Sequence, residues 1–250
     1  MTAPVFVAPT SVLSRASPGG TVLLDGPEGR HAASVRRLRP GEPVDLVDGE
    51  GLRAHGVVQQ VLAADALQIE VRDSGYEPSA QPRVAVLLAL IKGDRFEDAV
   101  QMLTELGVDE IVPWAAARSV VQWRGEKSAR AVERVRSTAT EAGKQSRRAR
   151  FPLVSPLLST DQAVARMATA DGAVVLHESA QEPLTGRPLP REGEIWVVVG
   201  PEGGIDDAEL RAFAAAGARP ARLGGTVLRT ATAAVSGAAL VLAQCGRLAR

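Results

Sequence analysis

The chain of 250 residues has little of several residue types, and each shortage excludes a class of protein. Its single cysteine, Cys245, rules out an internal disulfide and fits a reducing compartment such as the cytoplasm. His31, His55 and His177 are far apart in the sequence and have no ligand-spaced partners, so we expect no metal site. No apolar run reaches about eighteen residues and no charged-then-apolar leader is recognised, so we expect neither a membrane span nor secretion.

An excess of charge is also missing, because 29 Lys and Arg residues balance 29 Asp and Glu residues. A net charge of zero argues against binding of nucleic acid over the whole surface. The charge is nevertheless uneven, since residues 118–150 hold ten Lys and Arg against three Glu. This segment is either a solvated helix surface or a local phosphate-binding face, and charge alone does not decide between them.

The hydrophobic content of 45 % suffices for a folded core, and the length allows one or two domains. Residues 1–76 alternate short apolar runs with turns that contain glycine and proline, which predicts a small barrel-like β domain with one short helix at His31–Leu38. The expected strands are Val5–Val7, Thr21–Leu24, Val44–Val47, Ala54–Val61 and Leu67–Val71. Residues 77–82 contain two prolines and form the expected linker.

Residues 83–250 are predicted to form an α/β domain. Arg83–Leu90 is an apolar strand, residues 94–106 repeat apolar side chains at helical spacing, and Val108–Val112 is the next strand. A strand, a helix and a strand in this order form a right-handed unit whose two strands are parallel. Further expected elements are helices at Ser128–Gly143 and Asp161–Ala170 and a strand at Gly172–Leu176.

Two glycine loops follow strands near the end of the chain. Ile195–Val199 is a continuous apolar run, as in strands buried on both faces, and the glycine-rich loop 200–204 follows it. Asp206 and Asp207 are expected to cap a helix that ends at Phe213. A second strand, at 218–223, leads to Gly224 and Gly225, and a helix of small residues begins near Thr230. Loops at the carboxyl ends of neighbouring parallel strands form the usual ligand crevice of an α/β sheet.

The residue types in these loops limit the ligand. The chain contains neither the Gly-x-x-x-x-Gly-Lys-Ser/Thr phosphate loop nor the Gly-x-Gly-x-x-Gly dinucleotide fingerprint. Neither glycine loop carries a lysine that would balance a triphosphate. Loops lined by backbone and nearly without charge suit adenine, ribose and a sulfonium methyl donor better.

The sequences G-P-E-G-G-I at 200–205 and L-G-x-x-V-L-R-T-x-T-A at 223–233 resemble the C-terminal signature of SPOUT-class RNA methyltransferases. Within that class, the chain is most similar to the bacterial 16S rRNA uridine-N3 methyltransferases. The resemblance implies a parallel α/β domain over 83–250 with a deep trefoil knot at about 172–250, and a PUA-like N-terminal domain. It also implies S-adenosylmethionine as methyl donor, with S-adenosylhomocysteine as product, and no metal.

The same resemblance assigns donor binding to residues in and beside the two loops. These are Leu176, His177, Gly200, Pro201, Glu202, Gly203, Gly204, Leu223, Gly224, Val227, Leu228, Thr230, Thr232 and Ala233. Thr230 and Thr232 are expected mainly to cap the final helix, with donor contact as a secondary role. Glu202 either supports the first loop, which we favour, or receives a proton.

RNA contacts are implied by three further motifs. The order H-x-x-x-V-x-R-x-x-x-G-x-x-V-x-L-x-D-G at 31–49 resembles the PUA-like domain, and I-K-G-D-R-F-E at 91–97 and K-Q-S-R-R-A-R-F-P at 144–152 resemble motifs of the same family. The implied RNA-binding residues are Arg36, Arg37, Arg39, Lys92, Arg118, Gln145, Arg147 and Arg148. The implied partners are 16S rRNA in the 30S ribosomal subunit and a second copy of the chain, and neither DNA nor a membrane.

Arg229 is the candidate catalytic residue, because a fixed cation beside the methyl donor stabilises the anion that uracil forms when N3 loses its proton. Its alternative role is to bind a phosphate of the same RNA. The chain has Gly225, Thr226 and Ala231 where the family usually has Pro, Arg and Glu. These departures leave open a non-catalytic RNA-binding or ribosome-assembly protein, and an enzyme acting on tRNA or 23S rRNA is a further alternative.

The final helix is also the expected contact between two copies of the chain. Its small residues allow two backbones to approach closely across a twofold axis. The residues expected in this contact are Ala233, Ala234, Gly237 and Ala238.

Overall fold

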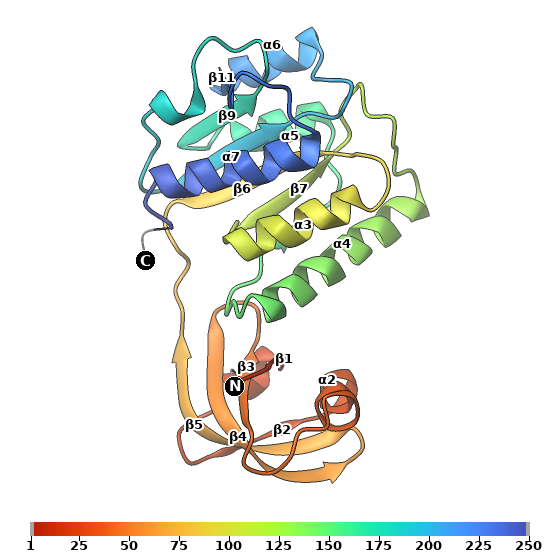
Figure 1. The fold of residues 1–250 in the computed structure, drawn as a ribbon, viewed down its shortest axis with the longest axis vertical. Coiled ribbons are helices and arrows are strands. Elements are labelled where there is room, and N and C mark those ends of the chain that lie inside the picture. The colour runs from red at the N-terminus through yellow and green to blue at the C-terminus, as the bar shows by residue number, and fades with distance from the viewer. Residues whose placement is uncertain (1–2, 249–250) are drawn as a thin grey trace. The chain divides into compact units, whose positions relative to one another are not determined.

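A computed structural model describes residues 3–248 of the chain, and Figure 1 draws it as a ribbon. The described residues form two compact units. The first unit comprises the residues up to Ser79 together with Gly143–Phe151. The second comprises Ala80–Ala142 and the residues from Pro152 onward. The first unit is therefore built from two segments that are far apart in the sequence.

A five-stranded sheet with the strand order β1-β3-β4-β5-β2 forms the frame of the first unit. Its elements are β1 (Val5–Val7), α1 (Thr10–Leu13), β2 (Thr21–Leu24), α2 (Gly26–Arg30), β3 (Pro43–Val47), β4 (Leu52–Ala63) and β5 (Ala66–Tyr76). β1 is parallel to β3, and the other neighbours are antiparallel. Phe6, Leu46 and Ile69 are buried in one shared core, so the predicted N-terminal β unit is confirmed.

The helix predicted at His31–Leu38 differs from the observed one. α2 begins earlier, at Gly26, and continues directly into a π-helical turn at His31–Val35. The earlier start depends on Gly29, where a Cβ atom would lie 2.2 Å from the carbonyl oxygen of Asp65 in the β4–β5 turn. A glycine is required there because the two backbones touch.

The segment Gly143–Phe151 packs within the first unit through an aromatic ring, a backbone hydrogen bond and an ion pair. Cβ atoms built on Gly49 and Gly143 would lie 2.7 and 2.3 Å from ring atoms of Phe151, so this side chain fills the space that both glycines leave. The N–H of Phe151 donates to the carbonyl oxygen of Gly49 at 2.8 Å. Lys144, which is buried, pairs with Glu28 at 2.7 Å. These contacts hold the second segment of the first unit in place.

Replacing Phe151 with Ala is expected to lower the free energy of unfolding by about 2 kcal/mol, because a half-buried ring leaves a cavity between two glycines that no side chain can fill. Thermal and urea unfolding measure this loss. Leu153→Ala is the control, since Leu153 is 56 % exposed and its truncation opens no cavity. Equal stability of the two variants would contradict this account of the segment.

The second unit is built on a six-stranded parallel sheet with the order β11-β9-β10-β6-β7-β8. Its strands are β6 (Arg83–Ala89), β7 (Glu110–Trp114), β8 (Leu153–Val154), β9 (Gly172–Leu176), β10 (Glu194–Val199) and β11 (Arg219–Ala221). Its helices are α3 (Arg95–Leu106), α4 (Glu126–Gln145, whose last residues belong to the first unit), α5 (Thr160–Met167), a 3-10 turn at Leu184–Gly186, α6 (Asp207–Ala215) and α7 (Thr230–Gln244).

Helices cover both faces of this sheet. Along β6, Val84, Val86 and Leu88 are buried in a core with side chains of α3, α4 and α7. The alternate residues Ala85 and Leu87 are buried in a second core with side chains of α5 and α6. The continuous apolar runs of β6 and β10 follow from burial on two faces. The predicted α/β fold with a parallel sheet is confirmed.

Some boundaries differ from the prediction. β7 begins at Glu110 instead of Val108, because Asp109 turns its carboxylate to the N–H of Val84 at 2.8 Å and to Arg247 at 2.7 Å. β8 was not predicted, since a strand of two residues has no periodicity. Within residues 3–248, no helix is long and apolar enough to cross a membrane.

Candidate functional site

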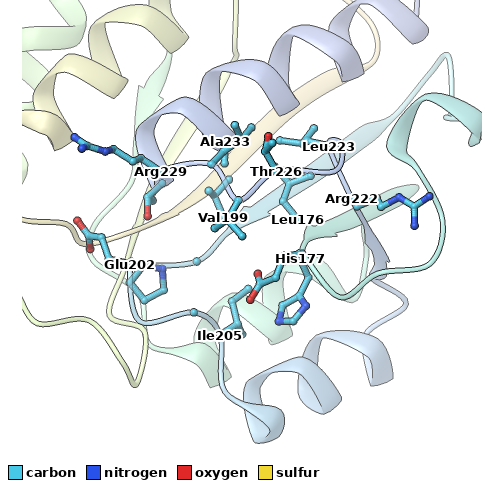
Figure 2. A pocket seen from close by; sticks show the side chains of 18 residues that line it. Leu176, His177, Val199, Glu202, Ile205, Arg222, Leu223, Thr226, Arg229 and Ala233 are labelled. Carbon is cyan, nitrogen blue, oxygen red and sulfur yellow. The ribbon is translucent and has the colours of Figure 1, made fainter.

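A pocket of about 310 Å³ opens at the carboxyl ends of β9 and β10, beside the loop that follows β11 and the start of α7 (Figure 2). It is lined by Leu176, His177, Glu178, Val199, Gly200, Pro201, Glu202, Gly204, Ile205, Arg222, Leu223, Gly224, Thr226, Val227, Leu228, Arg229, Thr230 and Ala233. This is the crevice expected where the two glycine loops meet. Its volume is at the lower end of the range for small-molecule sites.

The structure brings together all of the residues predicted for donor binding except two. Gly203 turns away from the pocket toward Arg118, and Thr232 is exposed on α7. The pocket also contains residues that the sequence reasoning missed, namely Glu178, Val199, Ile205, Arg222 and Thr226. Val199 and Ile205 flank the first glycine loop directly, so their places in the sequence could have predicted that they line the pocket.

The first glycine loop is shaped by contacts of its backbone. A Cβ atom on Gly200 would lie 2.5 Å from the side chain of Ile205, and Gly204 has a φ of 75°, which disfavours other residues. The N–H of Gly204 donates to the carbonyl oxygen of Pro201 at 2.9 Å. The exposed carboxylate of Glu202 makes no hydrogen bond or ion pair with residues 3–248. Both roles considered for Glu202, support of the loop and receipt of a proton, therefore stay predictions.

The second glycine loop leaves open space. Gly224 and Gly225 do not adopt positive φ, and no described atom lies within 4 Å of a Cβ atom built on either residue. Chain geometry therefore gives no reason for glycine here. Small residues at the rim leave room for a ligand to lie against the backbone.

The start of α7 differs from the prediction that threonines cap it. Arg229 is the N-cap residue, with φ −64° and ψ 150°, and no side chain accepts a hydrogen bond from the first turn. Thr230 is the first helical residue and is buried, while Thr232 is exposed. The helix therefore begins at the pocket with no side-chain cap, which favours polar or negative ligand atoms at this end.

The small residues of α7 have a different use from the one predicted. Ala234, Gly237 and Ala238 are buried inside the second unit. A Cβ atom on Gly237 would lie 2.5 Å from Cδ1 of Leu176, which lines the pocket. These three residues let the helix approach its own sheet, so they do not form the predicted contact between two copies of the chain, and the fourth, Ala233, is half-buried and lines the pocket.

The ionisable side chains that Figure 2 labels lie on two sides of the pocket. His177 and Arg222 lie on one side, and Glu202 and Arg229 lie on the other. Nδ1 of His177 accepts from the N–H of Ser179 at 3.3 Å and lies 2.8 Å from its hydroxyl, which leaves the ring proton on Nε2. The exposed guanidinium of Arg229 makes no hydrogen bond or ion pair within the described part of the chain.

Replacing Ser179 with Ala is expected to loosen the hold on this ring. The variant loses the hydroxyl that lies 2.8 Å from Nδ1 but keeps the backbone N–H, so the Nδ1–H tautomer of His177 gains population while Nε2–H stays the major form. Nitrogen NMR of the labelled histidine reports the tautomer ratio directly. A single Nε2–H tautomer in the variant would show that the N–H of Ser179 alone fixes the ring. Ser14→Ala, in the first unit, is the control.

The residues predicted to bind RNA are divided between the two units. Arg36, Arg37, Arg39, Gln145, Arg147 and Arg148 belong to the first unit, and Lys92 and Arg118 to the second. All are exposed except Arg148, which is half-buried. Arg37 and Arg147 have φ of 55° and 59°, at positions directly after helical turns where glycine is usual.

The pocket fits S-adenosylmethionine better than a nucleoside triphosphate. Apolar side chains such as Leu176, Val199 and Leu223 form a wall suited to adenine, and glycine backbones leave the rim open. Two arginines and two glutamates line the pocket without a lysine, so no excess positive charge awaits phosphates. Among the described residues, no group of three or more metal-binding side chains gathers.

A parallel α/β sheet with a pocket between two glycine loops at its carboxyl edge defines a ligand-binding α/β protein. Residues 77–242 match the family model described as RNA methyltransferase domain, and residues 24–72 match the model described as RNA methyltransferase PUA domain. The chain belongs to the RNA methyltransferase family. The family recognised from the glycine loops is confirmed.

Named relatives cover most of the chain. A Mycobacterium bovis protein named Ribosomal RNA small subunit methyltransferase E is 43 % identical over 86 % of this chain and 84 % of its own length. A Bacillus subtilis protein of the same name is 32 % identical over 85 % of this chain and 86 % of its own length.

Solved structures resemble the whole fold. The Neisseria gonorrhoeae Ribosomal RNA small subunit methyltransferase E, bound to S-adenosyl methionine, superposes with a TM-score of 0.85 at 27 % identity and covers 97 % of this chain and 98 % of its own. A Legionella pneumophila methyltransferase in complex with SAM superposes with a TM-score of 0.84 at 26 % identity, with the same coverage.

Proposed function

We propose that this chain transfers a methyl group from S-adenosylmethionine to N3 of a uridine in the 16S rRNA of the small ribosomal subunit. The observation that carries the proposal is the pocket formed by both glycine loops, in a chain that belongs to the RNA methyltransferase family. Its relatives named Ribosomal RNA small subunit methyltransferase E support the substrate class. The choice of uridine N3 comes from the resemblance of the loops to uridine-N3 enzymes.

S-adenosylmethionine supplies an electrophilic methyl group when it is bound. The chain has to hold the donor, exclude water and place the acceptor nitrogen in line with the methyl carbon. N3 of uracil carries a proton that must leave, and negative charge then spreads over the ring. Arg229 stands at the pocket with a guanidinium that no described residue neutralises, so it is the residue proposed to stabilise that charge.

The target uridine has to be unpaired or turned out of a helix, because N3 lies on the Watson–Crick edge. The exposed arginines of the first unit, which include Arg36, Arg37 and Arg39, are proposed to bind RNA phosphates. Lys92 and Arg118, at the carboxyl edge of the sheet, are proposed to bind phosphates near the target nucleotide.

Three further properties belong to the same proposal. The knot at about 172–250 follows from the resemblance to knotted methyltransferases. A homodimer follows from the same source and has to use a surface other than the buried residues of α7. The site of action is the cytoplasm, where small ribosomal subunits are assembled.

The experiment is transfer of labelled methyl from S-adenosylmethionine to 30S subunits that lack the native modification, followed by nucleoside analysis. Labelled 3-methyluridine in 16S rRNA is the expected product. Label in tRNA or 23S rRNA would overturn the substrate assignment. Donor binding without transfer would identify the non-catalytic alternative, in which Thr226 at the pocket and Ala231 on α7 mark a site that has lost turnover.

A further inference from the structure

Glu209 is a buried carboxylate that joins two loops beside the pocket. It lies in the first turn of α6, directly after the first glycine loop, and is only 5 % exposed. One of its oxygens, Oε1, accepts from the backbone N–H of Ala117 at 2.8 Å and from the hydroxyl of Thr160 at 2.8 Å. The other, Oε2, accepts from the N–H of Asp206 at 3.3 Å. Capping α6 explains only the bond to Asp206.

The bond to Ala117 fixes the loop that follows β7. Ala117 precedes Arg118, and this loop lies against the first glycine loop: a Cβ atom on Gly203 would lie 3.0 Å from the carbonyl oxygen of Arg118. The guanidinium of Arg118 reaches back to the carbonyl oxygen of Gly203 at 3.4 Å. Arg118 therefore lies against the first glycine loop through both its backbone and its side chain, and its backbone follows the residue that Glu209 holds.

The groups around the Glu209 side chain are hydrogen-bond donors, so this position requires an acceptor. Thr160 donates to Glu209 and itself accepts from Nε1 of Trp114 at 3.1 Å, so its hydroxyl has one orientation. The only serine of the loop, Ser119, is buried and makes no side-chain hydrogen bond with residues 3–248. The loop thus depends on a side chain from another element. A charged acceptor gives a stronger bond to an N–H than a neutral one, and burial increases the loss when it is removed.

We propose that Glu209 is a positioning residue that holds Arg118 beside the donor pocket, where Arg118 binds a phosphate of the RNA next to the target nucleotide. The inference rests on the proposed function and names the connection between its donor loop and its RNA contact. Guanidinium groups bind phosphate oxygens in pairs, which makes the orientation of Arg118 matter as well as its charge.

The test uses Glu209→Met, which keeps the volume of the side chain and removes both acceptors. The expected result is an increase in KM for the 30S subunit of about tenfold, with kcat and donor affinity changed less than about twofold. Glu209→Gln keeps an oxygen that accepts from the N–H of Ala117, so its KM for the 30S subunit is expected to be close to that of the wild-type chain. Thr160→Val removes one donor to Glu209, and its KM is expected to lie between those of Glu209→Gln and Glu209→Met.

A double-mutant cycle separates positioning from general stability. Arg118→Ala is expected to raise KM to a similar extent, and the double variant Arg118→Ala/Glu209→Met is expected to have the same KM as Arg118→Ala alone. Asp206→Ala is the matched control, because it breaks the cap of α6 without touching Ala117. Additive losses, an equal rise in KM for Asp206→Ala, or an unchanged KM for Arg118→Ala would each overturn the proposal.

Failure of the proposed function gives a different result from failure of the positioning role. The wild-type chain would then transfer no methyl group to 30S subunits. In that case the same cycle is measured by filter binding of 16S rRNA. Non-additive losses of affinity at Arg118 and Glu209 support the positioning role independently of turnover, and additive losses overturn it.

Discussion

Arg229→Ala is expected to lower kcat for methylation by about 10²–10³ and to leave the affinity for S-adenosylmethionine within about twofold. The reason is that the guanidinium stands at the pocket without a protein partner among the described residues, so its charge is available to the reacting base. Single-turnover transfer to 30S subunits measures the rate, and calorimetry measures donor binding.

The kinetics also distinguish the two roles considered for Arg229. A group that stabilises charge only in the transition state lowers kcat, whereas a phosphate contact raises KM for the RNA and leaves kcat unchanged. Arg219→Ala is the control, because Arg219 is an exposed arginine on β11 outside the pocket lining. Unchanged turnover of the Arg229 variant would remove this residue from catalysis.

Gly237→Ala is expected to weaken donor binding by at least about tenfold. A Cβ atom at this position lies 2.5 Å from Cδ1 of Leu176, so either Leu176 moves into the pocket or α7 moves away from the sheet. Each response changes the wall against which the donor lies. Overpacking of this kind also lowers stability by about 1–3 kcal/mol.

Donor titration by calorimetry and thermal unfolding measure the two effects of Gly237→Ala. Gly186→Ala is the matched control, because its Cβ atom would meet only Pro183 at an ordinary distance of 3.7 Å. Equal donor affinity in the two variants would show that Leu176 can move without cost to the pocket. A normal KM for RNA at saturating donor is expected for both.

The sequence predicted the elements that are buried on both faces. β9 was placed at its observed limits, and β6 and β10 within one residue of theirs, because a strand between two helix layers is apolar at every position. The pocket followed from this result, since glycines directly after two such strands mark the carboxyl edge of the sheet. Asp206 was also recognised as a cap, because a carboxylate before a helical run accepts the free N–H groups.

Contacts between distant segments were beyond the reach of periodicity. Nothing local indicates that Ala117 bonds to Glu209, or that Phe151 fits between Gly49 and Gly143, because each contact depends on the complete fold. From the sequence alone, the small residues of α7 predict a surface between two copies of the chain. A stripe of small residues has the same appearance whether it faces a partner or the protein's own sheet.

The division of the first unit into two segments constrains its synthesis on the ribosome. The residues up to Ser79 emerge first, but the ring that fills the space beside Gly49 belongs to Phe151. The N-terminal sheet therefore lacks these contacts, including the ion pair between Glu28 and Lys144, until Ala80–Ala142 of the other unit has been made. A fragment that stops at Ser79 would lack the ring of Phe151 and the Lys144 partner of Glu28, so the first unit completes its interior only after residue 151 has been made.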